Sequence, residues 1–193
     1  RENRPFLFQL AATLADNSCD ADRIARAMDS PALSIDLRAA QRLSAALREN
    51  HVRGGWTVRV HSRGTELIDF VPAGSRSLGL AVDLGTTNVA AFLLDLESGM
   101  RIASLGIENP QTAWGADLIS RINHAISGPQ AGAELRAAAV TALNALAHDL
   151  CLSAGSHSES IVDAVICGNT AMHHLLLGLP VRQLGRAPFV ATL

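Results

Sequence analysis

Lysine and tyrosine are absent from this sequence, and all 16 basic residues of the 193-residue chain are arginine. A Walker-type phosphate loop, a Schiff base and any other catalytic lysine are therefore excluded for this chain. The formal net charge is −2 at pH 7, and the arginines do not gather into one basic cluster. Because a nucleic-acid footprint needs clustered basic residues, we do not expect nucleic acid as a partner.

Cysteines are few, and long apolar runs are missing. Cys19, Cys151 and Cys167 are too widely spaced for the ligand sets of zinc sites or iron–sulfur clusters. We interpret them as small buried side chains in a reducing compartment. No run of eighteen or more apolar residues is present, so no membrane-spanning helix is expected. The first residues lack the layout of a signal peptide, and we expect a cytoplasmic protein.

The apolar content of 48% is enough for one substantial core and a small additional unit. Residues 1–75 have the pattern of a small α+β unit. The spacing predicts a strand at 4–10, a helix after an N-cap aspartate or serine near residue 17, a second helix at 34–49, and a hairpin with strands at 56–61 and 67–71. A linker is predicted at 71–77.

The pattern changes in the second unit, residues 76–193. Three apolar runs predict consecutive strands, which we expect to be covered on both faces, at 78–84, 88–96 and 100–107. The elements predicted after them are helices at 115–127 and 133–152, a strand at 161–167 and a short helix at 171–177. Gly178 and Pro180 are predicted to end that last helix.

The most distinctive stretch is GLAVDLGTTNVAAFLLDLESG, in which two apolar runs flank a turn of four residues, Gly85, Thr86, Thr87 and Asn88. Two hydroxyls and successive N–H groups of such a turn can point into one concavity and hold phosphate oxygens without lysine. Asp83 would then lie beside the phosphates, and Mg²⁺ bound largely through water would relieve the repulsion. The alternative is an ordinary hairpin whose threonines simply favour β-structure.

A second turn of similar composition follows the strand at 161–167 and consists of Gly168, Asn169 and Thr170. It begins a helix, and the free N–H groups at a helix N-terminus favour an anion. Helix capping by Asn169 or Thr170 explains the same residues without a ligand. The adjacent His173 and His174 point about 100° apart on a helix, so they cannot bind a metal together as an i, i+4 pair can.

The D-x-G-T-T hairpin resembles the first phosphate-binding motif of the ASKHA superfamily of actin, sugar kinases and heat-shock chaperone ATPases. More narrowly, the sequence resembles the reductive activators of corrinoid proteins in four ordered segments, GLAVDLGTTNVAAFLLDLESG, NPQTAWGADLISRI, VICGNTAMHHLLLG and LGRAPF. The resemblance implies an α/β fold. It places an incomplete ribonuclease-H-like, actin-like ATPase lobe at 76–193 and a small α+β linker domain at 1–75.

The resemblance also implies an activity, the ATP-dependent reduction of Co(II) to Co(I) in a corrinoid protein of a methyltransferase system. Electrons come from a [2Fe-2S] ferredoxin domain in that family, and the implied cofactors are ATP and Mg²⁺. Asp83 is assigned the catalytic and metal-orienting role. This chain has neither the cluster-binding cysteines nor the second phosphate loop. We therefore expect a middle fragment with weak nucleotide affinity, no activity alone and an uncovered sheet edge, with homodimerisation left open.

Between the two turns lies the signature N-P-Q-x-x-x-G-A-D-x-x-x-R. Asp117 and Arg121 are four residues apart on a predicted helix, and a surface ion pair accounts for them. The alternative, suggested by the resemblance, is that Asn109 and Gln111 border the nucleotide cleft or the interface with the corrinoid protein.

Two other functions stay open at this point. One is a sugar-kinase-like phosphotransferase, which needs a sugar-contacting carboxylate that the sequence does not identify. The other is a non-enzymatic module that docks a corrinoid protein. Magnesium-dependent nucleotide binding would distinguish the two enzymes from the docking module.

Overall fold

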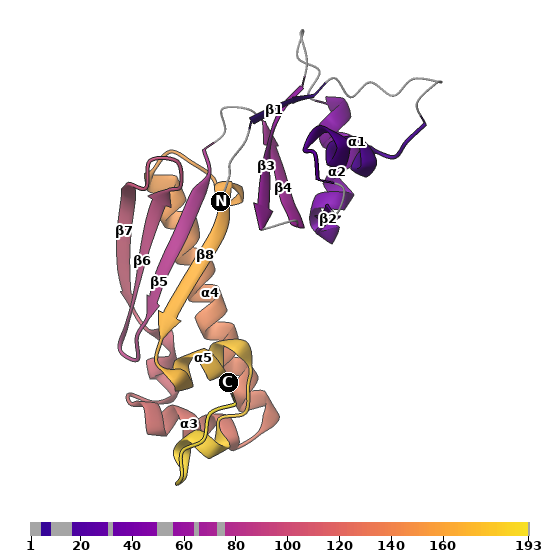
Figure 1. Cartoon of the computed structure of the whole chain (residues 1–193). Coiled ribbons are helices and arrows are strands. Elements are labelled where there is room, and N and C mark those ends of the chain that lie inside the picture. The colour runs from indigo at the N-terminus through magenta and orange to yellow at the C-terminus, as the bar shows by residue number, and fades with distance from the viewer. Residues whose placement is uncertain are drawn as a thin grey trace. The chain divides into compact units, whose positions relative to one another are not determined.

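The computed structural model describes residues 5–8, 17–30, 33–49, 56–63, 66–72 and 76–192. The chain divides into two compact units, Arg1–Arg76 and Ser77–Leu193, each of which is described by itself (Figure 1). Part of the predicted linker, residues 73–75, lies outside the described residues.

The first unit contains a four-stranded sheet with the order β1-β3-β4-β2 and two helices. Its strands are β1 (Pro5–Phe8), β2 (Ser34–Ile35), β3 (Trp56–Arg63) and β4 (Glu66–Pro72). Strand β3 is antiparallel to β1 and β4, and β2 is parallel to β4. The helices are α1 (Asp20–Ala27) and α2 (Leu37–Glu49). Four apolar residues form the described core, Ile24, Ala39, Leu43 and Leu67.

Both helices of this unit begin later than the sequence pattern predicts. The residue before α1 is Cys19, without a side-chain capping bond, so the predicted aspartate or serine cap is wrong. Helix α2 begins at Leu37 instead of residue 34 because Asp36 accepts the N–H of Arg38 at 2.8 Å, as an N-cap side chain does. The preceding residues Ser34–Ile35 pair with β4 instead.

The second unit contains a sheet with the order β7-β6-β5-β8. Its strands are β5 (Leu78–Leu84), β6 (Asn88–Asp95), β7 (Arg101–Glu108) and β8 (Ile161–Gly168). Strands β5, β6 and β7 form an antiparallel meander, whereas β8 lies parallel to β5. A parallel neighbour requires a crossover, which the helices between β7 and β8 supply. This mixed α/β arrangement is the incomplete actin-like lobe that the sequence predicts.

The core of the second unit lies between the sheet and the long helix α4 (Pro129–Ser153), which runs along one face of the sheet (Figure 1). Alternate residues of β5 and β6 point into it, namely Leu78, Leu80, Val82, Leu84, Val89, Ala91 and Leu93. Helix α4 contributes Leu135, Leu143, Leu146 and Leu150. Each buried leucine stabilises the fold by about 1.5–3 kcal/mol relative to an exposed one.

The prediction that the first three strands are covered on both faces is wrong for β7, whose residues are all exposed or partly exposed and whose Leu105 is 38% exposed. Strand β8, for which the sequence pattern makes no such prediction, is also open to solvent. Val165 in this strand is 64% exposed, and β8 is the last strand of the sheet, so its outer edge has no neighbouring strand among the described residues. The open edge agrees with the expectation for an incomplete lobe. Within the described ranges, none of the helices has both the length and the apolar character needed to cross a bilayer.

The remaining elements lie near one end of the sheet, where β5 and β8 terminate (Figure 1). They are the 3-10 helix η1 (Pro110–Trp114), α3 (Leu118–Ile126), α5 (Thr170–Leu177) and η3 (Arg182–Gly185), whereas η2 (Ser158–Ser160) precedes β8. Helix α3 begins three residues later than predicted because Asp117 caps it through the N–H of Ser120. Helix α4 begins earlier than predicted, with Pro129 in its first turn, a position that tolerates proline.

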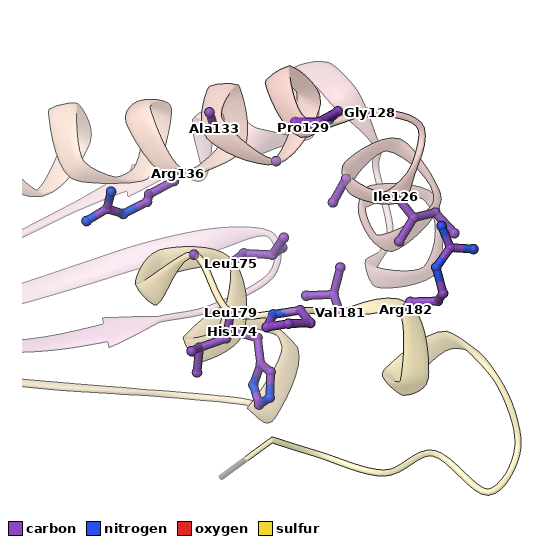
Figure 2. A pocket seen from close by; sticks show the side chains of 14 residues that line it. Ile126, Gly128, Pro129, Ala133, Arg136, His174, Leu175, Leu179, Val181 and Arg182 are labelled. Atoms are coloured by element: carbon purple, nitrogen blue, oxygen red, sulfur yellow. The ribbon is translucent and has the colours of Figure 1, made fainter.

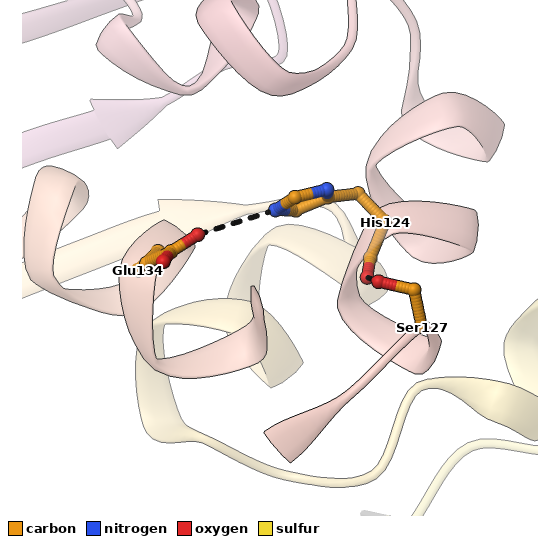
Figure 3. Close-up of polar contacts among 3 residues, drawn as sticks. All are labelled: His124, Ser127 and Glu134. Carbon is orange, nitrogen blue, oxygen red and sulfur yellow. Dashed lines mark hydrogen bonds and ion pairs between the residues drawn. The ribbon is translucent and has the colours of Figure 1, made fainter. Parts of the chain in front are cut away.

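Helices α3 and α4 approach each other through a polar contact. His124 Nε2 lies 3.6 Å from Glu134 Oε2, and the Ser127 hydroxyl donates to the carbonyl of His124 at 2.7 Å (Figure 3). The His124 side chain is 29% exposed and that of Glu134 is 41% exposed. Although His124 Nε2 itself is buried, both side chains are partly exposed, so the contact contributes little to stability.

Candidate functional site

The two glycine-containing turns lie side by side, although most of the second unit separates them in the sequence. Strands β5 and β8 are parallel neighbours, and their last residues, Leu84 and Gly168, stand opposite each other. The chains therefore leave the sheet at the same edge. Asn169 Nδ2 of the second turn donates to Thr86 Oγ1 of the first at 3.1 Å. The structure thus brings together the two turns that the sequence singles out.

Both turns require glycine for steric reasons. A Cβ atom at Gly85 would lie 2.5 Å from the carbonyl oxygen of Asn88, and one at Gly168 would lie 2.8 Å from the carbonyl oxygen of Leu84. Real Cβ atoms essentially never come this close to backbone. Any other residue at either position would therefore displace the turn.

The carbonyl groups of the first three residues of the first turn, Gly85, Thr86 and Thr87, all accept hydrogen bonds from the protein. Asn109 Nδ2 donates to the carbonyl of Gly85 at 2.7 Å, and the backbone N–H of Asn109 donates to the carbonyl of Thr87, also at 2.7 Å. Arg121 Nη2 donates to the carbonyl of Thr86 between them. The acceptor groups of the turn are therefore directed at donors from η1 and α3.

The amide N–H groups of the same three residues are not used within the described part of the chain. Gly85, Thr86 and Thr87 donate no backbone hydrogen bond to another described residue. In a trans peptide the N–H of residue i+1 points opposite to the carbonyl of residue i, so the held carbonyls of Gly85 and Thr86 direct the N–H groups of Thr86 and Thr87 to the other side. Successive free N–H groups form a concavity that suits an anion.

The donors behind the turn belong to a buried polar network. The side chains of Asn109, Gln111 and Arg121 are each 0% exposed. Gln111 Nε2 donates to the carbonyl of Leu135 in α4 at 2.9 Å, and its N–H donates to Asn109 Oδ1 at 2.9 Å. Since each group has a partner, the network fixes the turn against α4 instead of leaving costly unsatisfied groups.

Arg121 does not form the surface ion pair that its spacing from Asp117 indicates. It donates Nε to the carbonyl of Gly115 at 2.8 Å and approaches Gln111 Oε1 at 3.5 Å. Burial lowers the pKa of Arg121, and the charge of Asp117 opposes that shift. The Asp117 carboxylate is exposed and caps α3, accepting the N–H of Ser120 at 2.8 Å and its hydroxyl at 2.9 Å.

Those hydrogen bonds from Ser120, the backbone N–H first and then the hydroxyl, lower the pKa of Asp117 because they favour the charged carboxylate. The four-residue spacing is the same for a surface ion pair and for an exposed Asp117 that caps the helix while Arg121 is buried. Sequence reasoning therefore missed the buried role of Arg121, and the clustering of amides around it in the N-P-Q signature was the available signal.

The second turn is tied into helix α5. Asn169 Oδ1 accepts the N–H of Met172 at 3.0 Å, so the capping interpretation is confirmed. His174 is buried, with Nδ1 bonded to the carbonyl of Thr170 at 2.7 Å and Nε2 accepting the N–H of Thr192 at 3.0 Å. Nε2 of His173 is buried without a partner among the described residues. The two hydrogen bonds of His174 therefore fix its ring within the protein.

Asp83 lies one residue before the end of β5, opposite Ala90 of β6 and Cys167 of β8. Its side chain alternates with the core-facing leucines, so it is on the sheet face away from α4, and it is exposed. The carboxylate forms no hydrogen bond or ion pair with another described residue. No group of three or more His, Cys, Asp or Glu side chains in the described ranges could hold a metal. A single carboxylate with water and phosphate ligands nevertheless fits Mg²⁺.

A separate cavity of about 580 Å³ lies between the end of α3, the start of α4, α5 and the segment that follows α5. Figure 2 shows apolar side chains such as Ile126, Leu175 and Val181 around it, with Arg136 and Arg182 on opposite sides. None of the residues of either turn lines this cavity. It was not anticipated from the sequence.

Comparisons with known proteins agree with the resemblance seen in the sequence. Residues 78–193 match the RACo middle region, and residues 10–76 match the RACo linker region. Corrinoid activation enzyme RamQ of Eubacterium limosum is 36% identical over 130 residues, which are 66% of this chain and 22% of that protein. A solved structure named reductive activator for corrinoid, iron-sulfur protein matches with a TM-score of 0.76 and 30% identity, over 100% of this chain and 32% of that one. The chain thus belongs to the RACo family.

Proposed function

We propose that this chain carries the first phosphate-binding turn of an enzyme that uses ATP to activate a corrinoid protein reductively. The names of two similar proteins, a corrinoid activation enzyme and a reductive activator, support this class of activity. The chain spans 22% and 32% of those relatives, so the activity is proposed for the full-length protein. One observation carries the proposal: the carbonyls of Gly85, Thr86 and Thr87 are held by buried donors, whereas no described residue accepts a hydrogen bond from their N–H groups.

In this proposal the phosphate oxygens accept the free N–H groups of the first turn and the hydroxyls of Thr86 and Thr87. Asn88 completes that turn, and each charge-assisted hydrogen bond contributes about 1.5–3 kcal/mol. The second turn adds the first N–H groups of α5 beside Gly168, Asn169 and Thr170, because a helix N-terminus carries partial positive charge.

Asp83 is the proposed orienting ligand for Mg²⁺. Its exposed carboxylate lies at the end of the strand that leads into the first turn, and no described side chain engages it. Water molecules bound to the ion would donate hydrogen bonds to the carboxylate, as Mg²⁺ next to phosphates usually keeps several waters. When bound, Mg²⁺ neutralises phosphate charge, and Asp83 fixes its position.

The proposed reaction adds one electron to Co(II) in the corrinoid and yields Co(I). The electron comes from a [2Fe-2S] cluster of a ferredoxin domain, for which this chain supplies no ligand set. ATP binding or hydrolysis drives the transfer, and the corrinoid protein of a methyltransferase system is the proposed partner. Residues 1–75 are the proposed linker domain, and a reducing cytoplasm is the proposed compartment.

The test is nucleotide binding to the full-length protein, measured by calorimetric titration with ATP in the presence and absence of Mg²⁺. Asp83→Ala should weaken Mg²⁺-dependent binding at least about tenfold, since the charged ligand to the ion is lost. Asp149→Ala, which removes an exposed carboxylate on α4, is the matched control and should bind like the unmodified protein. Equal affinities of the Asp83→Ala variant and the unmodified protein would reject the assignment.

A second measurement separates the activator from its alternatives. The Co(I) absorption band of an added Co(II) corrinoid protein should grow with time in the presence of reductant and ATP. ATP binding without that reduction would favour a sugar-kinase-like phosphotransferase. Complex formation with the corrinoid protein and no nucleotide binding would favour a docking module.

A further inference from the structure

Arg121 holds a positive charge in a place where solvent does not reach. It lies in α3, its side chain is 0% exposed, and its described partners are all neutral. They are the carbonyl of Gly115 at 2.8 Å, Gln111 Oε1 at 3.5 Å, Met172 Sδ at 3.7 Å and the carbonyl of Thr86. Among the described residues, no carboxylate lies within ion-pair distance of the guanidinium.

A buried guanidinium stays protonated, so its charge has to be compensated by something else. Burying a charge is costly unless an opposite charge or several dipoles offset it. The acidic group that acts on Arg121 through space is Asp117, but that carboxylate is exposed and is engaged in capping α3. The hydrogen bonds of Arg121 are thus satisfied, whereas its charge is only partly balanced.

The guanidinium is aimed at the phosphate-binding turn. Nη2 donates to the carbonyl of Thr86, and the N–H of the same peptide unit belongs to Thr87. That N–H points the opposite way and is not bonded to a described residue. A cation on the carbonyl side polarises the peptide and makes its N–H a stronger donor toward an anion. Arg121 therefore acts on the turn through one peptide plane.

We propose that Arg121 is the positive counter-charge of this turn and makes its affinity rise with the number of charges on the bound phosphate chain. This inference rests on the proposed function, because it assumes that the turn receives a polyphosphate. Arg121 is a positioning residue in this scheme, since it acts through the Thr86 peptide and does not touch the ligand. The chain contains no lysine that could supply the charge.

Met172 offers a matched pair of variants. Its Sδ lies 3.7 Å from Arg121 Nη1, and its side chain is 0% exposed. Met172→Glu places a carboxylate against the guanidinium and neutralises its charge while Arg121 stays in place. Met172→Gln introduces a neutral polar group of nearly the same shape. The two variants differ in charge alone, so the comparison isolates the field of Arg121 from its packing.

The experiment measures the affinity of the full-length protein for ATP and ADP with Mg²⁺ at low and high ionic strength. Met172→Glu should bind ATP about tenfold more weakly than Met172→Gln, with a smaller loss for ADP and a weaker dependence on salt. If Arg121 had a purely structural role, Met172→Glu would bind ATP at least as tightly as Met172→Gln, because the new ion pair would hold the guanidinium at least as firmly. Equal ATP affinities of the two variants would overturn the inference.

Substitutions of Arg121 itself provide a second comparison if the glutamate prevents folding. Arg121→Lys keeps the charge and should retain much of the preference for ATP over ADP, whereas Arg121→Met should lose it. Equal losses for both nucleotides in both variants would mean that Arg121 only supports the turn. Absence of nucleotide binding by the unmodified protein would reject the proposed function itself, which is a different outcome from equal behaviour of the variants.

Discussion

Asn109 donates its side-chain N–H to the carbonyl of Gly85 at 2.7 Å across 24 residues of sequence. Its own backbone N–H donates to the carbonyl of Thr87, so a single residue orients two of the three peptide groups in the turn. The amide oxygen of the side chain accepts the N–H of Gln111 at 2.9 Å. The conformation of the turn is therefore determined mainly by a residue outside it.

The first prediction concerns Asn109→Asp, which replaces the donating amide with an acceptor of the same shape. The carboxylate would face the carbonyl of Gly85 inside the protein, and we expect a loss of about 1–3 kcal/mol in the free energy of unfolding. Urea unfolding followed by circular dichroism measures this change. Asn144→Asp, at an exposed position of α4, should stay within about 0.5 kcal/mol of the unmodified protein. Equal losses in the two variants would contradict the assigned role of Asn109.

The second prediction concerns the steric limit at Gly85. Gly85→Ala places a methyl group 2.5 Å from the carbonyl oxygen of Asn88, so the turn has to move and ATP binding should be lost in the folded protein. Gly132→Ala in α4 is the control. Its Cβ would meet the carbonyl of Ala125 at an ordinary 3.7 Å, and alanine in a helix is favoured over glycine by about 1 kcal/mol. Calorimetric titration and thermal unfolding of both variants separate the two effects.

The strands and the position of the turns could be predicted from the sequence. Apolar runs at β5 and β6 indicate two core strands because both runs are short and are bounded by a glycine-containing turn, whereas buried helices are usually longer. The exposure of β8 could not be read in this way. Its run IVDAVIC is as apolar as that of β5, but its position at the edge of the sheet depends on long-range pairing.

Helix starts and the buried network show two different limits. Asp36 and Asp117 are ordinary N-cap residues, so the observed starts of α2 and α3 could have been predicted by giving local capping more weight than periodicity. The spacing of Arg121 from Asp117 gives no signal of its burial, because an i, i+4 pair has the same spacing on a solvent-exposed helix. The amides of the N-P-Q signature were the only hint. The packing of α3 against η1 and α5 decides whether Arg121 is an exposed ion-pair partner or a buried side chain.

The third prediction concerns the reactivity of the cysteines. Cys151 is 1% exposed, and burial raises the pKa of its thiol, with a smaller contribution from the charge of Glu159. Cys19 and Cys167 are exposed, so the interpretation of the cysteines as buried is wrong for these two. Cys151 should react with iodoacetamide much more slowly than Cys167, because the thiolate is the reactive form. Peptide mass spectrometry after timed labelling measures both rates. Faster modification of Cys151 than of Cys167 would contradict the packing of α4.

The fourth prediction uses the same labelling as a footprint of the phosphate site. Cys167 stands opposite Asp83 in the paired strands, so a nucleotide with Mg²⁺ at the proposed site should slow its alkylation. Cys19, in the other unit, is also exposed and should label at an unchanged rate. Unchanged labelling of Cys167 at saturating MgATP would place the nucleotide elsewhere.

The fifth prediction concerns Asp117, whose pKa is lowered from 3.8 first by the backbone N–H of Ser120 and then by its hydroxyl. A carboxyl group with a lower pKa in the folded state stabilises the protein above the unfolded-state pKa, and this contribution is lost as the pH falls through the folded-state value. Asp117→Asn keeps a helix-capping side chain without the titration. The urea midpoint of the unmodified protein should therefore fall more steeply below about pH 4 than that of the variant. Asp149→Asn, which removes an exposed carboxylate on α4, is the control and should keep the steep fall of the unmodified protein. If the midpoints of Asp117→Asn and of the unmodified protein fell in parallel with decreasing pH, the charge of Asp117 would not contribute to stability.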